Sequence, residues 1–394
     1  MSPGNWPDRI RAQLAQVVDE GRWRSPRQFD ARGPQGTLDG ANVVSFASND
    51  YLGLSAHPAV RAAAHDALER WGTGAGASRL VTGSRPVHAE LEDELAQWKG
   101  SEAAVCFPTG FAANLGVLSV LAGPGVHIFS DELNHASIID GCRLSRAQLT
   151  VYRHGDLGQL DELLVAGDAG PQMLSLVVTD SVFSMDGDVA PLDELVALCA
   201  RRGALLVIDE AHAVLGPRLE LPPISEVAQT TVVRVGTLSK SLGALGGFVA
   251  ASRDVVDLLI NRARSYIFST ALSPADAAAA LSALRILRSS EGEALVERLA
   301  ALVQRMSRAG VVPPEHCSPI IPVILGSEQA AIDACTTLLE DGLWVPAIRP
   351  PTVPVGTSRL RVTLSAAHRD DDVTRLIDAL HSLPVPESIA VGAR

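Results

Sequence analysis

Short apolar runs rich in β-branched residues recur along the chain, and each one stops abruptly at a group of polar residues. The runs lie at 43–46, 103–107, 175–180, 205–209 and 232–235, and another begins at His127. Continuous apolar runs of this length are typical of strands buried on both faces of a parallel sheet. Because open α/β sheets bind ligands at the carboxyl ends of such strands, the polar groups after the runs are the candidate functional residues.

Helical spacing of apolar residues marks the two ends of the chain. Residues 8–20 carry Ile10, Leu14, Val17 and Val18 on one face, which predicts an amphipathic arm. After residue 270, helices are predicted at 274–288, 291–306, 328–340 and 369–382, with strands at 320–325 and 360–364. We therefore predict an N-terminal helical arm over 1–40, a large domain over 41–273 and a small C-terminal domain over 274–394.

Composition narrows the class of protein. With 394 residues, 47% of them hydrophobic and 20% charged, the chain has the make-up of an ordinary globular enzyme. Its net charge of −12 argues against nucleic acid as a partner. Five scattered cysteines without a CxxC pair indicate neither a disulfide framework nor a zinc cluster. No signal peptide and no apolar stretch of about 18 residues is present, so we expect a cytoplasmic protein that does not enter a membrane.

Candidate chemistry is concentrated after two of the predicted strands. Asp209 ends the run at 205–209, and Lys240 follows the run at 232–235. By themselves these two residues could form a structural ion pair. However, hydroxyls surround Lys240, and a lysine in a desolvated pocket can form a Schiff base with an aldehyde. An aspartate can keep a pyridine nitrogen protonated, so the pair indicates a site for a phosphorylated aldehyde.

The motifs that contain these residues resemble the fold-type-I pyridoxal-phosphate enzymes. Asp-x-x-His at 209–212 and Thr-x-x-Lys at 237–240 carry the cofactor in that family. The resemblance implies an α/β fold with a mostly parallel central sheet in the large, cofactor-binding domain and a smaller α+β domain. It implies pyridoxal 5'-phosphate as cofactor, with Lys240 as its attachment point and catalytic base and Asp209 as the partner of the ring nitrogen.

Further motifs resemble the α-oxoamine synthases, a branch of these enzymes, and occur in the same order. The Ser-Asn-Asp-Tyr-Leu-Gly-Leu segment at 48–54 matches residue for residue, which implies that Asn49 contacts the substrate. The Asn-His-Ala-Ser segment at 134–137 implies that His135 stacks on the pyridine ring. The resemblance covers about residues 40 to 383.

A helix predicted to start near Thr109 offers an anion site. Thr109 could be a plain N-cap, but free amides and the dipole at a helix start also bind phosphate. The family has similar residues here, which implies that Gly110 and Phe111 lie at the cofactor phosphate. The resemblance also places Thr237 near the phosphate and His212 beside the phenolic oxygen of the cofactor.

Two other motifs admit alternative interpretations. The Gly-rich segment 72–77 fits a dinucleotide-binding pattern, but it follows a helical run instead of a strand, so with 78–83 it is expected to form a loop over the site. The acidic residues of 182–188 suggest a metal site, yet their spacing lacks the remaining ligands of a calcium loop. We predict no metal, and the resemblance implies that Ser184 contacts the cofactor.

Arg361 lies in a predicted strand of a chain with few buried charges, so it requires an anionic partner. A substrate carboxylate held by two hydrogen bonds would provide one. Segment 347–364 is most similar to family members that join L-alanine to a pimeloyl thioester of CoA or carrier protein in biotin biosynthesis, with loss of the thiol and carbon dioxide. Arg349, Thr352 and Arg22 are further candidate substrate ligands, although Arg22 could equally be part of a solvated turn.

Other activities stay open at this point. The family also contains glycine C-acetyltransferase and 5-aminolevulinate synthase, which differ in amino acid and thioester. A non-catalytic pyridoxal-phosphate binding module is a second alternative, although an intact set of Lys240, Asp209 and His135 argues against it. Segment 213–223 departs from the family because it has fewer glycines, and we expect a stiffer loop there.

The segment at 268–270 bears on assembly. It follows Ser265-Tyr266-Ile267, which we interpret as strand-like, and it resembles the family segment that donates hydroxyls to the phosphate bound by the neighbouring subunit. Tyr266, Ile267 and Phe268 would form an exposed apolar patch if nothing covered them. We therefore predict a homodimer with shared active sites, in which Ser269 and Thr270 act across the interface.

Overall fold

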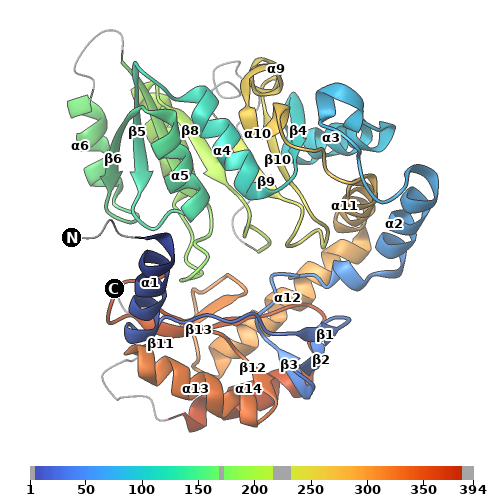
Figure 1. Ribbon diagram of the computed structural model, residues 1–394, viewed down its shortest axis with the longest axis vertical. Helices are drawn as coiled ribbons and strands as arrows, with labels where there is room; N and C mark the ends of the chain where they lie inside the picture. Colours follow the sequence, from blue (N-terminus) through green and yellow to red (C-terminus); the bar gives the residue numbers. More distant parts are fainter. Residues whose placement is uncertain (1–4, 168–172, 216–231, 384–394) are drawn as a thin grey trace.

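A seven-stranded sheet forms the centre of the larger of two bodies in the computed structural model, which describes residues 5–167, 173–215 and 232–383 (Figure 1). Its strand order is β4-β10-β9-β8-β7-β5-β6. Five strands, from β9 to β6, run parallel, and β10 is antiparallel to both of its neighbours. The bounds are β4 Ala103–Phe107, β5 Val126–Asp131, β6 Gln148–Tyr152, β7 Leu174–Asp180, β8 Leu205–Asp209, β9 Val232–Thr237 and β10 Gly247–Ala251. The predicted mostly parallel sheet is confirmed.

Both faces of this sheet are buried, which explains the continuous apolar runs. On β8, Val207 packs into one core, while Leu206 and Ile208 pack into the core on the opposite face. The first core lies under α4 Gly110–Leu121, α5 Ala136–Ser145, α9 Arg253–Arg262 and α10 Arg264–Ile267. The second lies under α6 Leu157–Gly167 and α7 Leu192–Arg202. Helix α3 Pro86–Lys99 packs against β4, α11 Pro274–Leu287 packs against α3, and α2 Pro58–Trp71 packs against α11.

The smaller body contains two short sheets. One has the order β1-β2-β3-β12 and the other β11-β14-β13. Their bounds are β1 Phe29–Ala31, β2 Gln35–Leu38, β3 Ala41–Ser45, β11 Ile320–Gly326, β12 Leu343–Trp344, β13 Ala347–Ile348 and β14 Ser358–Thr363. Helices α12 Ser290–Arg308, α13 Glu328–Glu340 and α14 Asp370–Ser382 cover them. Because β12 pairs in parallel with β3, residues 41–45 are joined to the C-terminal segment. The boundaries at residues 41 and 273 stay predictions.

Two local predictions are wrong. Ser265–Ile267 belongs to helix α10, not to a strand, because Ser265 Oγ donates to the carbonyl of Ala112 at 2.7 Å and Tyr266 is buried against Phe107. The expected loop at 78–83 contains a π-helical turn, η2 Arg79–Gly83. A 3₁₀ turn, η1 Leu54–Ala56, precedes α2.

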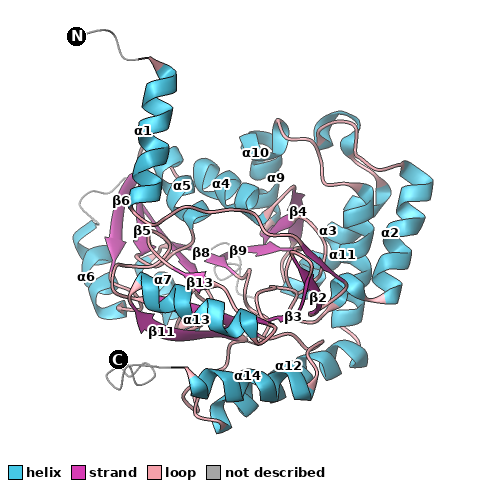
Figure 2. Ribbon diagram, turned by 60° about the horizontal axis from the view of Figure 1, so that its bottom comes forward, coloured by secondary structure: helices cyan, strands magenta, loops and turns pink. Residues whose placement is uncertain are grey.

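The amphipathic helix expected at residues 8–20 is confirmed as α1, which lies outside both bodies, whereas β1 and β2, also within the predicted arm over 1–40, belong to the smaller body. Helix α1, Trp6–Asp19, has no buried residue and projects from the rest of the molecule in Figure 2. Among the described residues, no helix is both long enough and apolar enough to cross a membrane.

Candidate active site

Asp209 and Lys240 meet at the carboxyl ends of two adjacent parallel strands. Asp209 ends β8 and pairs in register with Val235 of β9, and Lys240 follows β9 by three residues. Removal from water lowers the pKa of the Lys240 amine to about 8, against the nearby carboxylates of Asp209 and Asp180, which raise it. The lowered pKa makes far more of this amine uncharged near neutral pH than in an ordinary lysine, and the uncharged form can act as a nucleophile or base.

A continuous chain of hydrogen bonds runs from Lys240 to Arg361. Lys240 Nζ lies 2.7 Å from His212 Nε2, and His212 Nδ1 lies 2.5 Å from the Tyr51 hydroxyl. The Tyr51 hydroxyl donates to Asn49 Oδ1 at 3.2 Å, and Arg361 Nη2 donates to the same oxygen at 3.2 Å. Burial and the charges of Lys240 and Arg361 hold the pKa of His212 well below its usual range. A neutral His212 that accepts from the lysine leaves its other ring nitrogen to donate to Tyr51.

A second chain runs from Asp209 to His135. Asn114, on α4, donates through Nδ2 to Asp209 Oδ2 at 2.6 Å and to Ser137 Oγ at 2.9 Å. Ser137 Oγ lies 2.7 Å from His135 Nδ1, and the Ala211 amide donates to the other Asp209 oxygen at 2.9 Å. Burial lowers the pKa of His135, which favours the neutral ring, and Nδ1 accepts from the Ser137 amide at 3.3 Å, which leaves the ring proton to Nε2.

The start of α4 forms a ready anion site. Thr109 caps the helix by accepting from the Ala112 amide at 3.0 Å, and the amides of Gly110 and Phe111 have no hydrogen-bond partner among the described residues. A Cβ built on Gly247 would come within 2.5 Å of the Thr109 and Gly110 backbone, so only glycine lets β10 approach this close. The Thr237 side chain lies beside the same turn: its Cβ would be 3.4 Å from a Cβ added to Gly110.

Arg361 is a buried cation without an acidic partner in the described part of the chain. Its guanidinium donates to the Ser184 carbonyl at 2.5 Å, to Thr363 Oγ1 at 2.8 Å and to Asn49. No described carboxylate lies within 4.0 Å of it, and the side chain is buried in the strand β14. A buried charge needs a counter-ion, and an external carboxylate would supply it. Ser184 thus contacts Arg361 through its backbone instead of its hydroxyl.

The remaining predicted residues lie apart from Lys240. Arg22 pairs with Glu20 at 2.9 Å, and Arg349 donates to the Gly21 carbonyl at 2.8 Å, so both arginines meet at the end of α1. The exposed Thr352 donates its amide to the Arg349 carbonyl at 3.1 Å. None of the three residues is hydrogen-bonded to the two hydrogen-bond chains described above. Their role in binding substrate stays a prediction.

Two hydroxyls predicted to act across an interface, Ser269 and Thr270, follow α10. Neither one hydrogen-bonds to another described residue, and the next residue, Ala271, donates its amide to Ala77 at 3.0 Å. Of segment 213–223, only 213–215 falls in the described part of the chain, so the expected stiff loop lies mostly outside the described residues.

Four residues within or beside the two hydrogen-bond chains were not assigned from sequence: Tyr51, Asn114, Ser137 and Asp180. Tyr51 lies in a motif that pointed to Asn49, and Asn114 lies on the helix that pointed to Gly110. Asp180 ends β7 beside Asp209 and accepts from the His135 amide at 2.8 Å. Burial and Asp209 raise the pKa of Asp180 well above its usual range. Its position at a strand end was the available signal.

Known proteins with this architecture were found by comparison. The model of the family described as aminotransferase class I and II matches residues 41–380. The chain belongs to this family. A protein named 8-amino-7-oxononanoate synthase from Geobacter sulfurreducens is 48% identical, covering 94% of this chain and 96% of that protein. One of the same name from Anaeromyxobacter sp. (strain K) is 49% identical, covering 95% and 94%. The α-oxoamine synthase resemblance is thereby confirmed.

Solved structures of the family agree with the fold. Serine palmitoyltransferase from S. paucimobilis, with a bound PLP-myriocin adduct, superposes with a TM-score of 0.85 at 31% identity, covering 95% of this chain and 96% of that one. 8-Amino-7-oxononanoate synthase from Francisella tularensis gives 0.71 at 29% identity, covering 86% and 96%. The TM-score measures only the similarity of the backbone, and one fold can carry several activities. The 48% sequence identity to the 8-amino-7-oxononanoate synthase of Geobacter sulfurreducens is therefore the stronger indication of substrate class.

Proposed function

We propose that this protein condenses L-alanine with a pimeloyl thioester, of CoA or of a carrier protein, to give 8-amino-7-oxononanoate, the product in the names of its curated relatives. One observation carries the proposal: Arg361 is a buried cation without an acidic partner among the described residues, and a hydrogen-bond chain connects it to Lys240. An α-amino acid presents a carboxylate to the arginine and an α-proton to the lysine.

Pyridoxal 5'-phosphate is the cofactor, and its ring supplies an electron sink for charge that develops at the α-carbon. The residues present fit it. The free amides of Gly110 and Phe111 suit the phosphate, the Lys240 amine suits the aldehyde, and Asp209 suits a protonated ring nitrogen. We assign to the imidazole of His135 the role of stacking on the ring.

The residues of the chain have separate tasks in the reaction. Arg361 binds the alanine carboxylate, and Asn49 orients the Arg361 guanidinium by accepting a hydrogen bond from it. Lys240 removes the α-proton, with His212 and Tyr51 fixing the position of its amine. The α-carbon then attacks the thioester carbonyl, and the C–S bond breaks to release the thiolate, which takes a proton from solvent. The carboxylate leaves as carbon dioxide, and the proton held on Lys240 returns to the α-carbon.

We further propose that the protein is a cytoplasmic homodimer with shared sites. All five cysteines are free thiols, which suits a reducing compartment. Helix α1 exposes an apolar stripe, and Phe268 is 70% exposed beside the unpartnered Ser269 and Thr270. The stripe consists of Trp6, Ile10, Leu14 and Val18. A second copy of the chain would cover these surfaces and supply the two hydroxyls to the neighbouring phosphate.

Turnover of purified holoprotein tests the reaction. L-Alanine with pimeloyl-CoA, and with a pimeloyl carrier protein, should release thiol and carbon dioxide in equal amounts. Glycine with acetyl-CoA and glycine with succinyl-CoA serve as controls for the two related synthases. Faster turnover of either glycine pair would replace the proposed substrates, and cofactor binding without any turnover would favour a binding module.

A further inference from the structure

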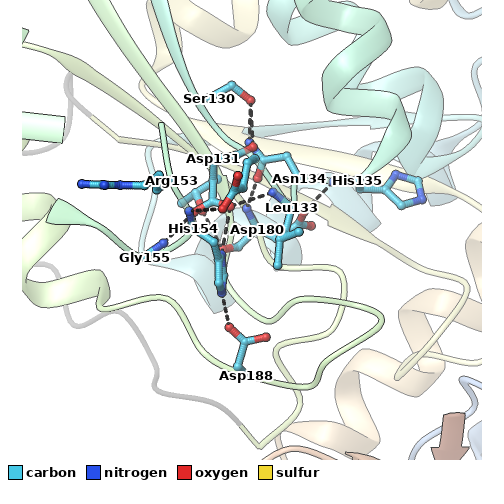
Figure 3. A network of polar contacts seen from close by, with 12 residues as sticks. Ser130, Asp131, Leu133, Asn134, His135, Arg153, His154, Gly155, Asp180 and Asp188 are labelled. Atoms are coloured by element: carbon cyan, nitrogen blue, oxygen red, sulfur yellow. Dashed lines mark hydrogen bonds and ion pairs between the residues drawn. The ribbon is translucent and has the colours of Figure 1, made fainter. Parts of the chain in front are cut away.

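His154 follows the end of β6 by two residues and lies between two aspartates. Its Nδ1 is 3.0 Å from Asp131 Oδ1 and its Nε2 is 2.6 Å from Asp188 Oδ2 (Figure 3). The ring also contacts Phe183 edge to face, with centroids 4.3 Å apart. Because both ring nitrogens face carboxylates, both must donate, which requires the imidazolium form.

The surroundings keep this charge on the ring. Burial lowers the pKa of His154, but hydrogen bonds to Asp131 and Asp188 outweigh burial and raise the pKa to about 10. Four further titratable groups lie nearby. Glu132 accepts from the His154 backbone amide, Arg153 pairs with Asp156, and His316 is bonded to the Ile320 carbonyl.

Asp131 connects His154 to the turn before His135, on one side of the active site. It ends β5 and also accepts from the amides of Leu133 and Gly155, at 2.9 and 3.1 Å. These bonds shape the turn that leads to Asn134 and His135. Asn134 in turn donates to the Val178 carbonyl at 2.9 Å and accepts from the amide of Asp180, which lies beside it in Figure 3.

Asp188 transmits the position of His154 to the other side. It closes the 183–188 loop, where the Phe183 amide donates to the Asp188 carbonyl at 3.0 Å. Asp186, in the same loop, forms an ion pair with the buried Arg359. The Ser184 carbonyl accepts from Arg361 Nε, so this loop helps to fix the guanidinium of Arg361, together with Thr363 and Asn49.

We propose that His154 is a positioning residue for the amino-acid substrate: as a doubly donating cation it clamps the turn that carries His135 to the loop that holds Arg361. The proposal rests on the function proposed above. His154 bonds to Asp131, Asp188 and Glu132 and to none of the residues assigned to substrate or cofactor, so its effect acts through these two segments, and a small misplacement of either one is costly.

His154→Gln is the primary test, with His65→Gln as matched control because the His65 side chain is 71% exposed. Spectral titration of holoprotein with L-alanine should show the Kd raised about tenfold by His154→Gln, since a displacement of about 1 Å can cost up to about 100-fold. Covalent loading of the cofactor on Lys240 should be unchanged. Asp188→Asn, which weakens only the loop side, should raise the Kd in the same direction.

The pH dependence of stability provides an independent measure. The folded-state pKa of His154 is raised from about 6.5 to about 10, so its stabilisation is complete below pH 6.5 and is lost as pH rises to 10. Urea unfolding of the wild type and of His65→Gln should show this decline, and His154→Gln should flatten it.

The outcomes separate the two proposals. An unchanged Kd for L-alanine in both His154→Gln and Asp188→Asn would overturn the positioning role. Lower stability with equal losses of cofactor and alanine affinity would overturn it too, because that pattern needs only a structural role. If His154→Gln does not fold, Asp188→Asn decides alone. Absence of turnover in the wild type would contradict the proposed reaction, whereas the ratio of variant to wild-type affinity tests His154.

Discussion

Lys240 is one of only two lysines in the chain, which makes its role easy to isolate. The other, Lys99, is held 2.6 Å from the buried Glu210 carboxylate and cannot substitute for it. We expect Lys240→Ala to abolish turnover and to leave no cofactor attached to the chain after borohydride reduction. Mass spectrometry of the reduced protein is the measurement, with Lys99→Met as the control that keeps a modified Lys240. A reduced adduct in Lys240→Ala would refute the assignment.

Asp209 offers a charge that an amide cannot replace. Asp209→Asn keeps the shape and one acceptor for Asn114, so the cofactor should still bind. Without the carboxylate the ring nitrogen loses its proton, and the lost charge-assisted bond corresponds to about 1.5–3 kcal/mol, or at least about tenfold in kcat. Steady-state kinetics alongside the exposed Asp66→Asn control give the comparison. Near-normal kcat would remove Asp209 from the electron-sink role.

At the scale of elements, the anion site depends on how closely β10 approaches α4. In Gly247→Ala the added methyl would meet backbone atoms of Thr109 and Gly110 at 2.5 Å, and backbone cannot rotate away. The start of α4 must therefore shift, and we expect the Kd for pyridoxal phosphate to rise about tenfold, or ~1.4 kcal/mol. Fluorescence titration of apoprotein measures this. Gly123→Ala, whose methyl meets nothing closer than 4.0 Å, is the matched control and should bind normally.

At the scale of the whole molecule, shared sites can be tested by complementation. We expect a mixture of inactive Lys240→Ala and inactive Ser269→Ala/Thr270→Ala chains to regain activity. Half of the randomly paired dimers are mixed and each has one intact site, so about one site in four should work. Mixing Lys240→Ala with Asp209→Asn should restore nothing, because both defects lie in the same half-site. Full activity in a sedimenting monomer would exclude shared sites.

Some site residues could be predicted from the sequence and others could not. Residues that end buried strands, such as Asp209, could be assigned from the apolar run before them, because parallel strands present their carboxyl ends at one edge. Tyr51 and Asn114 could not, since their partners, His212 and Asp209, lie 161 and 95 residues away. The strand expected at 265–267 failed because docking against α4, not local propensity, decides that segment.

By itself, the sequence determined the parallel sheet, the helical arm and the motifs around Lys240, because burial and helix periodicity leave local patterns in the chain. The tertiary structure alone decided what those motifs contact. It placed Arg361 at the end of a hydrogen-bond chain from Lys240, and it put His154 between two aspartates from separate segments. Such contacts form when the packing of elements far apart in the sequence brings side chains together. A local pattern of residues does not specify which distant side chains will meet.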